Sequence, residues 1–219
     1  YEADPKHRRL ILEHFGLDKG CKNLSYNGYK DTKEEDWELE PLVKEEATSF
    51  RALAARMNYL SQDCPDLQFP IKQCSRDMAN PTRGSWKKMK KMARYLLMRD
   101  RIVWIYKWQE EPEFSYVAAD SDWRGTIQDR KSTSGGVWML GGHSIKTWSA
   151  SQGATALSSA EAEFYAMIEA VLRAKGLLSL ASELGFEGLS NVVKIATDSS
   201  AAKSFVSRRG LGKMRHLEI

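Results

Sequence analysis

The spacing of apolar residues predicts helices in the first half of the chain. Apolar side chains recur every three or four residues over 4–15, 45–61 and 65–79, and again after Asn80-Pro81, where Asn80 is the expected N-cap. This period gives each helix one buried face. Residues 19–41 lack it and become increasingly acidic, so we expect a solvated connector there, with binding to a basic partner as the alternative.

Beyond Asp100 the pattern changes to alternation, which is typical of strands. We expect strands over 102–107, 114–119, 135–140, 144–148 and 191–197. The short Gly141-Gly142-His143 connection predicts a tight hairpin, so the second, third and fourth of these strands form an antiparallel meander.

Two helices are expected in the same half of the chain. Ser158 and Glu161 have capping-box spacing, so a long helix begins near Ser159, and Gly176 interrupts it. Its expected buried residues are Ala160, Phe164, Met167 and Val171. A short helix follows from Ser199 to about Ser207. The order from residue 114 onward is therefore β-β-β-α-β-α, which predicts an α/β fold with a mixed sheet and helices packed on it.

Composition excludes several classes of protein. With 219 residues, of which 42% are hydrophobic and 28% charged, the chain resembles ordinary globular proteins. It has no run of about 18 apolar residues and no basic-then-apolar leader, so we expect neither membrane insertion nor secretion. Three cysteines without CxxC spacing and four scattered histidines favour a reducing compartment and argue against a zinc site. Because the chain starts at Tyr1 and stops at Ile219 in mid-pattern, we interpret it as an excerpt of a longer polypeptide.

Positive charge is concentrated in one segment. Nine basic residues lie between Thr82 and Lys107 against Asp100 alone, although the net charge of the whole chain is only +4. A solvated helix face is the usual explanation of such a block. Its density here favours phosphate contacts that are independent of base sequence and weakened by salt. The residues singled out for this role are Lys87, Lys88, Lys90, Lys91 and Arg94.

Three acidic residues follow the predicted strands and begin the long helix. Asp120 closes the strand 114–119, Asp198 closes 191–197, and Glu163 lies in the first turns of the helix between them. If the two strands are parallel neighbours, their ends meet, and an oxygen-only cluster suits Mg²⁺. Each residue also has a structural alternative: a turn cap for Asp120, a solvated helix face for Glu163 and an N-cap for Asp198.

The amino-acid sequences of several motifs are more specific than the apolar and acidic patterns described above. The runs Asp120–Trp123, Asp129–Gly135, Leu157–Tyr165 and Thr197–Ala201 resemble the ribonuclease H domain of copia-type retrotransposon polyproteins. Upstream, 50–60, 65–66 and 76–81 are similar to the segment that joins reverse transcriptase to that domain. The resemblance covers about 49–216 and, more weakly, the N-terminal part. It implies three regions: 1–44, the end of reverse transcriptase and an acidic linker; 45–110, a helical thumb or connection region with the basic helix; and 111–219, an incomplete ribonuclease H-like domain.

The resemblance implies cleavage of the RNA strand of an RNA–DNA hybrid with two Mg²⁺ ions, Mn²⁺ being a substitute. Asp120, Glu163 and Asp198 match three members of the family's Asp-Glu-Asp-Asp set, and the fourth is expected beyond Ile219, which makes the domain C-terminally truncated. Arg130 and Lys131, within the second motif, are further candidates for nucleic-acid binding. The implied partners are the hybrid and the remainder of the Pol polyprotein, with no membrane and no small-molecule cofactor, inside the cell in a cytoplasmic particle or the nucleus.

The chain also departs from the family's pattern. Arg124 stands where the family usually has a small residue, Phe164 replaces a Tyr, and Glu218 replaces an Asp in a motif that includes His216. Two alternatives stay open, since the family's terminal strand and helix are missing while the basic helix remains. One is a non-catalytic nucleic-acid-binding remnant of the polyprotein, and the other is a decayed, partly unfolded remnant.

Overall fold

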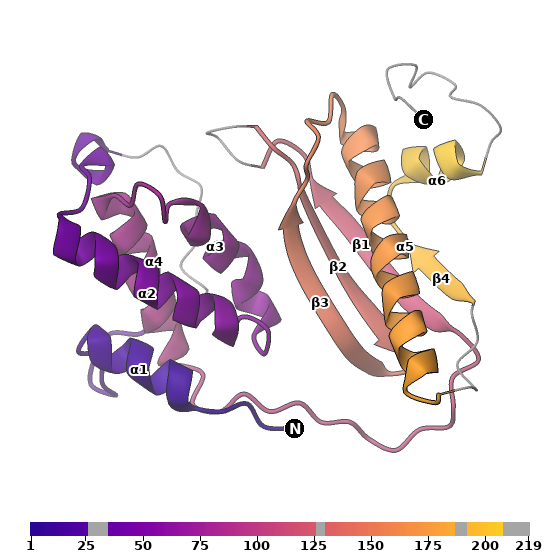
Figure 1. Ribbon diagram of the computed structural model, residues 1–219, viewed down its shortest axis with the longest axis horizontal. Coiled ribbons are helices and arrows are strands. Elements are labelled where there is room, and N and C mark those ends of the chain that lie inside the picture. Colours follow the sequence, from indigo (N-terminus) through magenta and orange to yellow (C-terminus); the bar gives the residue numbers. More distant parts are fainter. Residues whose placement is uncertain (26–34, 126–129, 187–191, 208–219) are drawn as a thin grey trace. The chain divides into compact units, whose positions relative to one another are not determined.

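The computed structural model describes residues 1–25, 35–125, 130–186 and 192–207. They belong to two compact units, Tyr1–Tyr106 and Lys107–Ile219 (Figure 1). Asp129, Asn191 and the His216–Glu218 motif lie outside the described residues, as does 26–34 of the acidic connector.

The first unit is helical. Its elements are α1 (Lys6–His14), the 3₁₀ helix η1 (Asp36–Leu39), α2 (Lys44–Leu60), α3 (Pro65–Arg76) and α4 (Arg83–Leu96). Completely or almost completely buried side chains from all four α-helices form one core, including Ile11, Phe50, Ile71 and Met89. The four helices predicted from the apolar period are therefore confirmed, with ends shifted by a few residues.

The predicted start of α4 at Asn80 is wrong. Thr82 is the N-cap, because its Oγ1 accepts a hydrogen bond from Ser85 N and its own N–H is bonded to Ser85 Oγ, each at 3.2 Å. A long-range contact explains the shift. The chain just before the helix pairs with the segment leading into α2, through Leu42 N to Pro81 O and Arg83 N to Glu40 O, both at 2.9 Å. Residues in that extended pairing cannot begin a helix.

The predicted strand 102–107 does not form. Only Val103 makes an antiparallel bridge, to Glu2, flanked by hydrogen bonds between Trp104 and Tyr1 and between Ile102 and Ala3. A strand needs a neighbouring strand to satisfy its backbone groups, and here the partner is a few N-terminal residues. Alternation alone does not reveal whether such a partner exists.

The second unit is a four-stranded mixed sheet with two helices. The strands are β1 (Ser115–Asp122), β2 (Thr133–Leu140), β3 (His143–Ser151) and β4 (Val193–Ala196), in the spatial order β3-β2-β1-β4. β1, β2 and β3 are antiparallel neighbours, and β4 joins β1 in parallel. Together with α5 (Ser159–Glu183) and α6 (Ser200–Val206), they confirm the predicted α/β class and the order β-β-β-α-β-α.

Helix α5 lies across one face of the sheet (Figure 1), and small residues form its contact side. Ala162, Ala166, Ala170 and Ala174 recur every fourth residue and are buried. Of the predicted buried set, 160, 164, 167 and 171, only Met167 is buried. The sheet supplies most of the bulk through Trp138 and Trp148, and α5 contributes mainly alanines, with Leu178 near its C-terminal end.

Helix α5 also continues through Gly176, so the predicted interruption there is wrong. A glycine lowers helix stability by only about 1 kcal/mol, which packing of the flanking turns offsets. Within the described residues, no helix is long and apolar enough to cross a membrane.

Two glycines of the second unit should respond oppositely to alanine. A Cβ at Gly136 would lie 2.2 Å from Cζ2 of the buried Trp148, so Gly136→Ala should destabilise the chain by about 1–3 kcal/mol. A Cβ at Gly176 meets open space within a helix, so Gly176→Ala should stabilise it by about 0.5–1 kcal/mol. Urea unfolding followed by circular dichroism measures both, and equal midpoints for the two variants would contradict the packing described.

Candidate functional site

The two aspartates of the site occupy matching positions on neighbouring strands. In the parallel pair of β1 and β4, Ala118 is opposite Ala196, and each aspartate lies two residues further along its chain. Parallel neighbours are about 4.8 Å apart, so Asp120 and Asp198 meet at one edge of the sheet. Asp120 does not end its strand as predicted. β1 continues to Asp122, because Ser121 and Asp122 are still paired with Ser134 and Thr133 of β2.

Glu163 reaches the same place from α5. The helix begins where predicted, with Ser158 Oγ accepting a hydrogen bond from Glu161 N at 3.2 Å, and Glu163 lies one turn beyond. Ligand oxygens of Asp120, Glu163 and Asp198 all lie within 4.8 Å of one another. The structure thus brings together the three carboxylates that the sequence singled out. We call them the carboxylate cluster.

Ser121 holds one oxygen of Glu163. Its N–H and its hydroxyl both donate to Glu163 Oε1, at 3.2 and 2.6 Å. The other oxygen, Oε2, is buried and forms no hydrogen bond with any described residue. Burial raises the pKa of Glu163, the charges of Asp120 and Asp198 raise it further, and the bonds from Ser121 oppose the shift. Glu163 therefore has a buried acceptor available for a cation.

The cluster suits a hard divalent cation. All three candidate ligands are carboxylates, and Asp120 and Asp198 are exposed while Glu163 is half-buried at their base. Oxygen ligands of this kind are preferred by Mg²⁺, Mn²⁺ and Ca²⁺ rather than by softer metals. A cation would also relieve the repulsion among three negative charges and satisfy Glu163 Oε2.

Glu161 and Asp198 were both given capping roles as alternatives to metal binding, and the structure separates the two residues. Glu161 accepts hydrogen bonds from Leu157 N at 2.7 Å and from the Tyr165 hydroxyl at 2.9 Å, so its expected capping role is local and outside the cluster. Asp198 does not cap α6, since Ser199 Oγ accepts the bond from Ala202 N at 3.1 Å. The carboxylate of Asp198 is therefore left for the cluster.

Phe164 links the two helices that flank the cluster. Its ring packs edge-on against Phe205 of α6, with centroids 4.6 Å apart. Since Glu163 precedes Phe164 and Asp198 precedes α6, this contact joins the two helices near the cluster.

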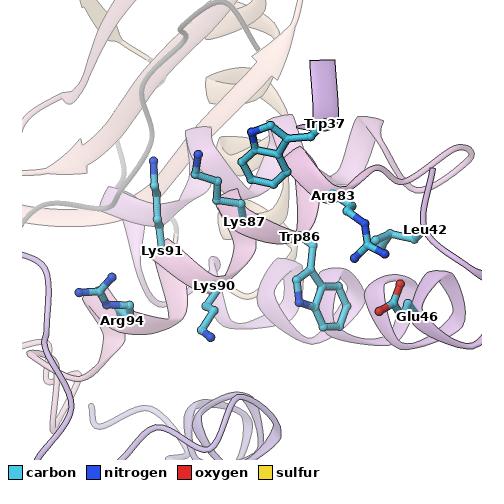
Figure 2. A pocket seen from close by; sticks show the side chains of 9 residues that line it. All are labelled: Trp37, Leu42, Glu46, Arg83, Trp86, Lys87, Lys90, Lys91 and Arg94. Atoms are coloured by element: carbon cyan, nitrogen blue, oxygen red, sulfur yellow. The ribbon is translucent and has the colours of Figure 1, made fainter. Parts of the chain in front are cut away.

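Five basic residues of α4 line a groove. Figure 2 shows Lys87 and Lys91 extending to the side where Trp37 lies, while Lys90 extends with Trp86 to the other side. The groove has a volume of about 370 Å³. Its lining is Trp37, Leu42, Glu46, Arg83, Trp86, Lys87, Lys90, Lys91 and Arg94. We call it the α4 groove.

Lys88, also predicted to bind nucleic acid, does not line the α4 groove. It lies near Cys74 of α3, where its charge opposes the burial that raises the pKa of that thiol to about 12. Arg130 and Lys131 belong to the second unit, just before β2, and Arg130 is exposed. The predicted set is therefore divided among separate surfaces.

Acidic residues of the connector already occupy part of the groove. Glu38 is only 9% exposed and forms an ion pair with Lys87, and Glu40 pairs with Arg83 at 3.3 Å. The expectation of a solvated connector is thus wrong for Glu38, whereas the other three residues of η1 are exposed, as expected. Lys90 and Lys91 form no ion pair with any described residue.

Two contributors were missed from the sequence. Ser121 could have been found, because alternation along β1 puts it on the α5 side with Val117 and Ala119, facing Glu163. Trp37 gave no signal, since it stands in an acidic stretch without periodicity.

Comparison with known proteins relates the chain to a family. The chain is 30% identical over 174 residues, 78% of its length, to the retrovirus-related Pol polyprotein from transposon RE2 of Arabidopsis thaliana. It is 29% identical over 139 residues, 63% of its length, to that from transposon RE1. The chain belongs to the Pol polyproteins of retrotransposons. It spans 12% and 9% of the length of these two relatives.

A further relative of this Pol chain has a different name. The secreted RxLR effector protein 161 of Plasmopara viticola is 30% identical over 124 residues, which cover 56% of the chain and 86% of that protein. No protein-family model and no solved structure matches the chain.

The raised pKa of Glu163 predicts a stabilising substitution. Because the folded-state pKa lies above the unfolded one, ionisation of Glu163 lowers stability as pH rises through the folded-state value, and the effect vanishes below the ordinary carboxyl pKa of about 4.3. Without divalent cations, Glu163→Gln should therefore melt at a higher temperature than the parent at neutral pH, and the gain should fade on acidification. Its amide oxygen can still accept from Ser121.

The matched control is Glu183→Gln, an exposed residue at the end of α5 outside the cluster. It should leave the melting temperature unchanged. A lower melting temperature for Glu163→Gln at neutral pH would contradict the electrostatic account.

Proposed function

We propose that this part of a Pol polyprotein is a ribonuclease H, which hydrolyses the RNA strand of an RNA–DNA hybrid with the help of Mg²⁺. The observation that carries the proposal is the convergence of Asp120 and Asp198, two residues beyond the paired Ala118 and Ala196 of parallel strands, with Glu163 of α5. The motifs around these residues and the kinship to Pol polyproteins support it. Action inside the cell, together with the rest of a Pol polyprotein, belongs to the same proposal.

The three carboxylates would hold the cations. Glu163 Oε2 is buried and lacks a described partner, and the two aspartates are open to solvent, where substrate phosphate can approach. When bound, two Mg²⁺ ions, or Mn²⁺ in their place, would activate a water and stabilise the departing oxygen of a phosphodiester.

The chain's own residues prepare this chemistry. Ser121 holds Oε1 of Glu163 through two hydrogen bonds, which restricts rotation of the carboxylate, and the buried Oε2 has no described partner. The cluster carries up to three negative charges, which repel phosphate unless they are neutralised. Substrate affinity and metal affinity should therefore rise together.

Cleavage of a hybrid by the chain should require Mg²⁺ or Mn²⁺ and the carboxylate cluster. Asp198→Asn removes a charged ligand and should lower the cleavage rate of a labelled RNA–DNA hybrid by at least about 100-fold, the scale for losing one group that stabilises transition-state charge. Duplex DNA and duplex RNA of the same sequence are the substrate controls. Gel analysis of the products measures this.

Glu183→Gln, which changes charge on the same helix away from the cluster, should cleave like the parent. Mg²⁺ should also raise the melting temperature of the parent but not of Asp198→Asn. Cleavage in EDTA, or full activity in Asp198→Asn, would overturn the assignment.

A second candidate function, non-catalytic binding of nucleic acid, is favoured by the α4 groove. It combines exposed cations with two indole rings, a combination that suits phosphates and bases. Trp37 is 44% exposed, and Lys87 lies 4.9 Å from the centre of its ring.

Nucleic-acid binding at the α4 groove should respond to its internal ion pair. Glu38→Gln frees Lys87, so binding of a labelled hybrid should strengthen and its log–log salt slope should steepen by up to about 0.9. Lys90→Ala should have the opposite effect. Fluorescence anisotropy across KCl concentrations measures both.

Glu13→Gln is the matched control, since Glu13 lies on α1 and does not line the groove. If Glu13→Gln strengthens binding as much as Glu38→Gln, only the net charge matters and the groove is not the binding surface.

A further inference from the structure

We propose that Arg124 binds a backbone phosphate of the nucleic-acid substrate beside the carboxylate cluster, and that it does so as a rigid, prepositioned cation. The inference rests on the proposed function and adds a residue that positions the substrate. Four observations support it: where Arg124 lies on the chain, which groups hold its side chain, which backbone conformation it adopts and which charges surround it.

The placement follows from β1. The strand continues from Asp120 to Asp122, and Arg124 lies two residues later. At about 3.3 Å per residue, Arg124 is at most about 13 Å from Asp120 along the chain. One strand of a duplex carries a phosphate about every 3.4 Å along its axis. A substrate with a phosphate at the cluster therefore has others within reach of Arg124.

The side chain of Arg124 is supported on an aromatic ring. Its guanidinium carbon lies 4.6 Å from the centre of the Trp123 indole. Trp123 is itself held, because its Nε1 donates to Ala156 O at 3.1 Å, just before α5. Arg124 is exposed, so the N–H donors of its guanidinium are accessible to a phosphate, which a guanidinium can bind in a bidentate manner.

The backbone of Arg124 is fixed as well. Its N–H donates to Ser132 Oγ at 3.2 Å, and Ser132 is completely buried. Ser132 is in turn joined to the end of β3, since its carbonyl accepts from Gln152 N at 2.9 Å. An arginine held at both ends loses little entropy on binding a ligand.

The conformation of Arg124 is unfavourable for its residue type. Its φ is +54°, in the left-handed region, where residues other than glycine and asparagine pay roughly 1–2 kcal/mol. The family that the sequence resembles usually has a small residue at this position, and a glycine there would adopt the left-handed backbone without this cost. The backbone cost means that Arg124 does not stabilise the turn. Residues with strained backbones cluster at functional sites.

Among the described residues, no carboxylate forms an ion pair with Arg124, although the carboxylate of Asp122 lies beside the neighbouring Gly125. A purely structural role is the competing explanation: the guanidinium would only cover the indole of Trp123, which is 38% exposed. Substitution distinguishes the two, because a cover contributes to stability whereas a phosphate ligand contributes to binding.

The test uses Arg124→Asn, because asparagine tolerates the left-handed backbone and lacks the charge. In an Asp198→Asn chain, which should not cleave, Arg124→Asn should weaken binding of a labelled RNA–DNA hybrid about 10-fold and make the salt slope shallower by about 0.9. Arg124→Lys should restore the slope and part of the affinity. In the cleaving chain, Arg124→Asn should raise KM with kcat nearly unchanged.

Lys175→Ala is the matched control, since it removes one exposed positive charge on α5. It should bind like its parent. Arg124→Asn with unchanged affinity and slope, or with an effect equalled by Lys175→Ala, would overturn the role of Arg124. Failure of the parent chain to bind or cleave any hybrid would instead overturn the proposed function.

Discussion

The parallel pairing of β1 with β4 is the constraint on which the second unit depends. Two parallel strands cannot be joined by a tight turn, so a crossover must carry the chain back along the sheet, and α5 is that crossover. The same pairing brings Asp120 and Asp198 to one edge. An antiparallel β4 would have put Asp198 at the opposite edge, so the direction of this short strand decides whether the cluster exists.

Close approach of α5 to the sheet is the second requirement. Glu163 reaches the aspartates only because buried alanines let the helix axis lie near the strands while Trp138 and Trp148 fill the remaining space. Packing and repulsion act against each other here. The apolar contacts and the two hydrogen bonds from Ser121 hold Glu163 in place, whereas the neighbouring carboxylates favour its protonation or departure. Charge repulsion in such a site lowers the stability of the fold, and a bound cation would relieve it.

Features set by local signals were predictable. The hairpin at Gly141-Gly142 and the start of α5 depend on residues within a few positions, and the three carboxylates stand at fixed distances from strand ends. Features set by distant partners were not. The N-cap moved from Asn80 to Thr82 because residues near 41 pair with that segment, and the strand 102–107 failed for want of a neighbour. The buried side of α5 was predicted from its largest apolar residues. In the structure the space between helix and sheet is filled mainly by the large side chains of the sheet, so the alanine side of the helix faces the sheet.

The α4 groove shows how an acidic segment can serve a basic surface. Clustered lysines and arginines on one helix repel one another, and Glu38 and Glu40 relieve this near the N-terminal half of α4, where the helix dipole also favours negative charge. These carboxylates stand where a polyanion would place its phosphates. A nucleic acid that bound the whole groove would have to replace them, so its net gain there is the difference between two sets of ion pairs. Lys90 forms no ion pair with a described residue, so it would bind a phosphate without losing such a contact, whereas Lys91 also lies within the field of Glu38.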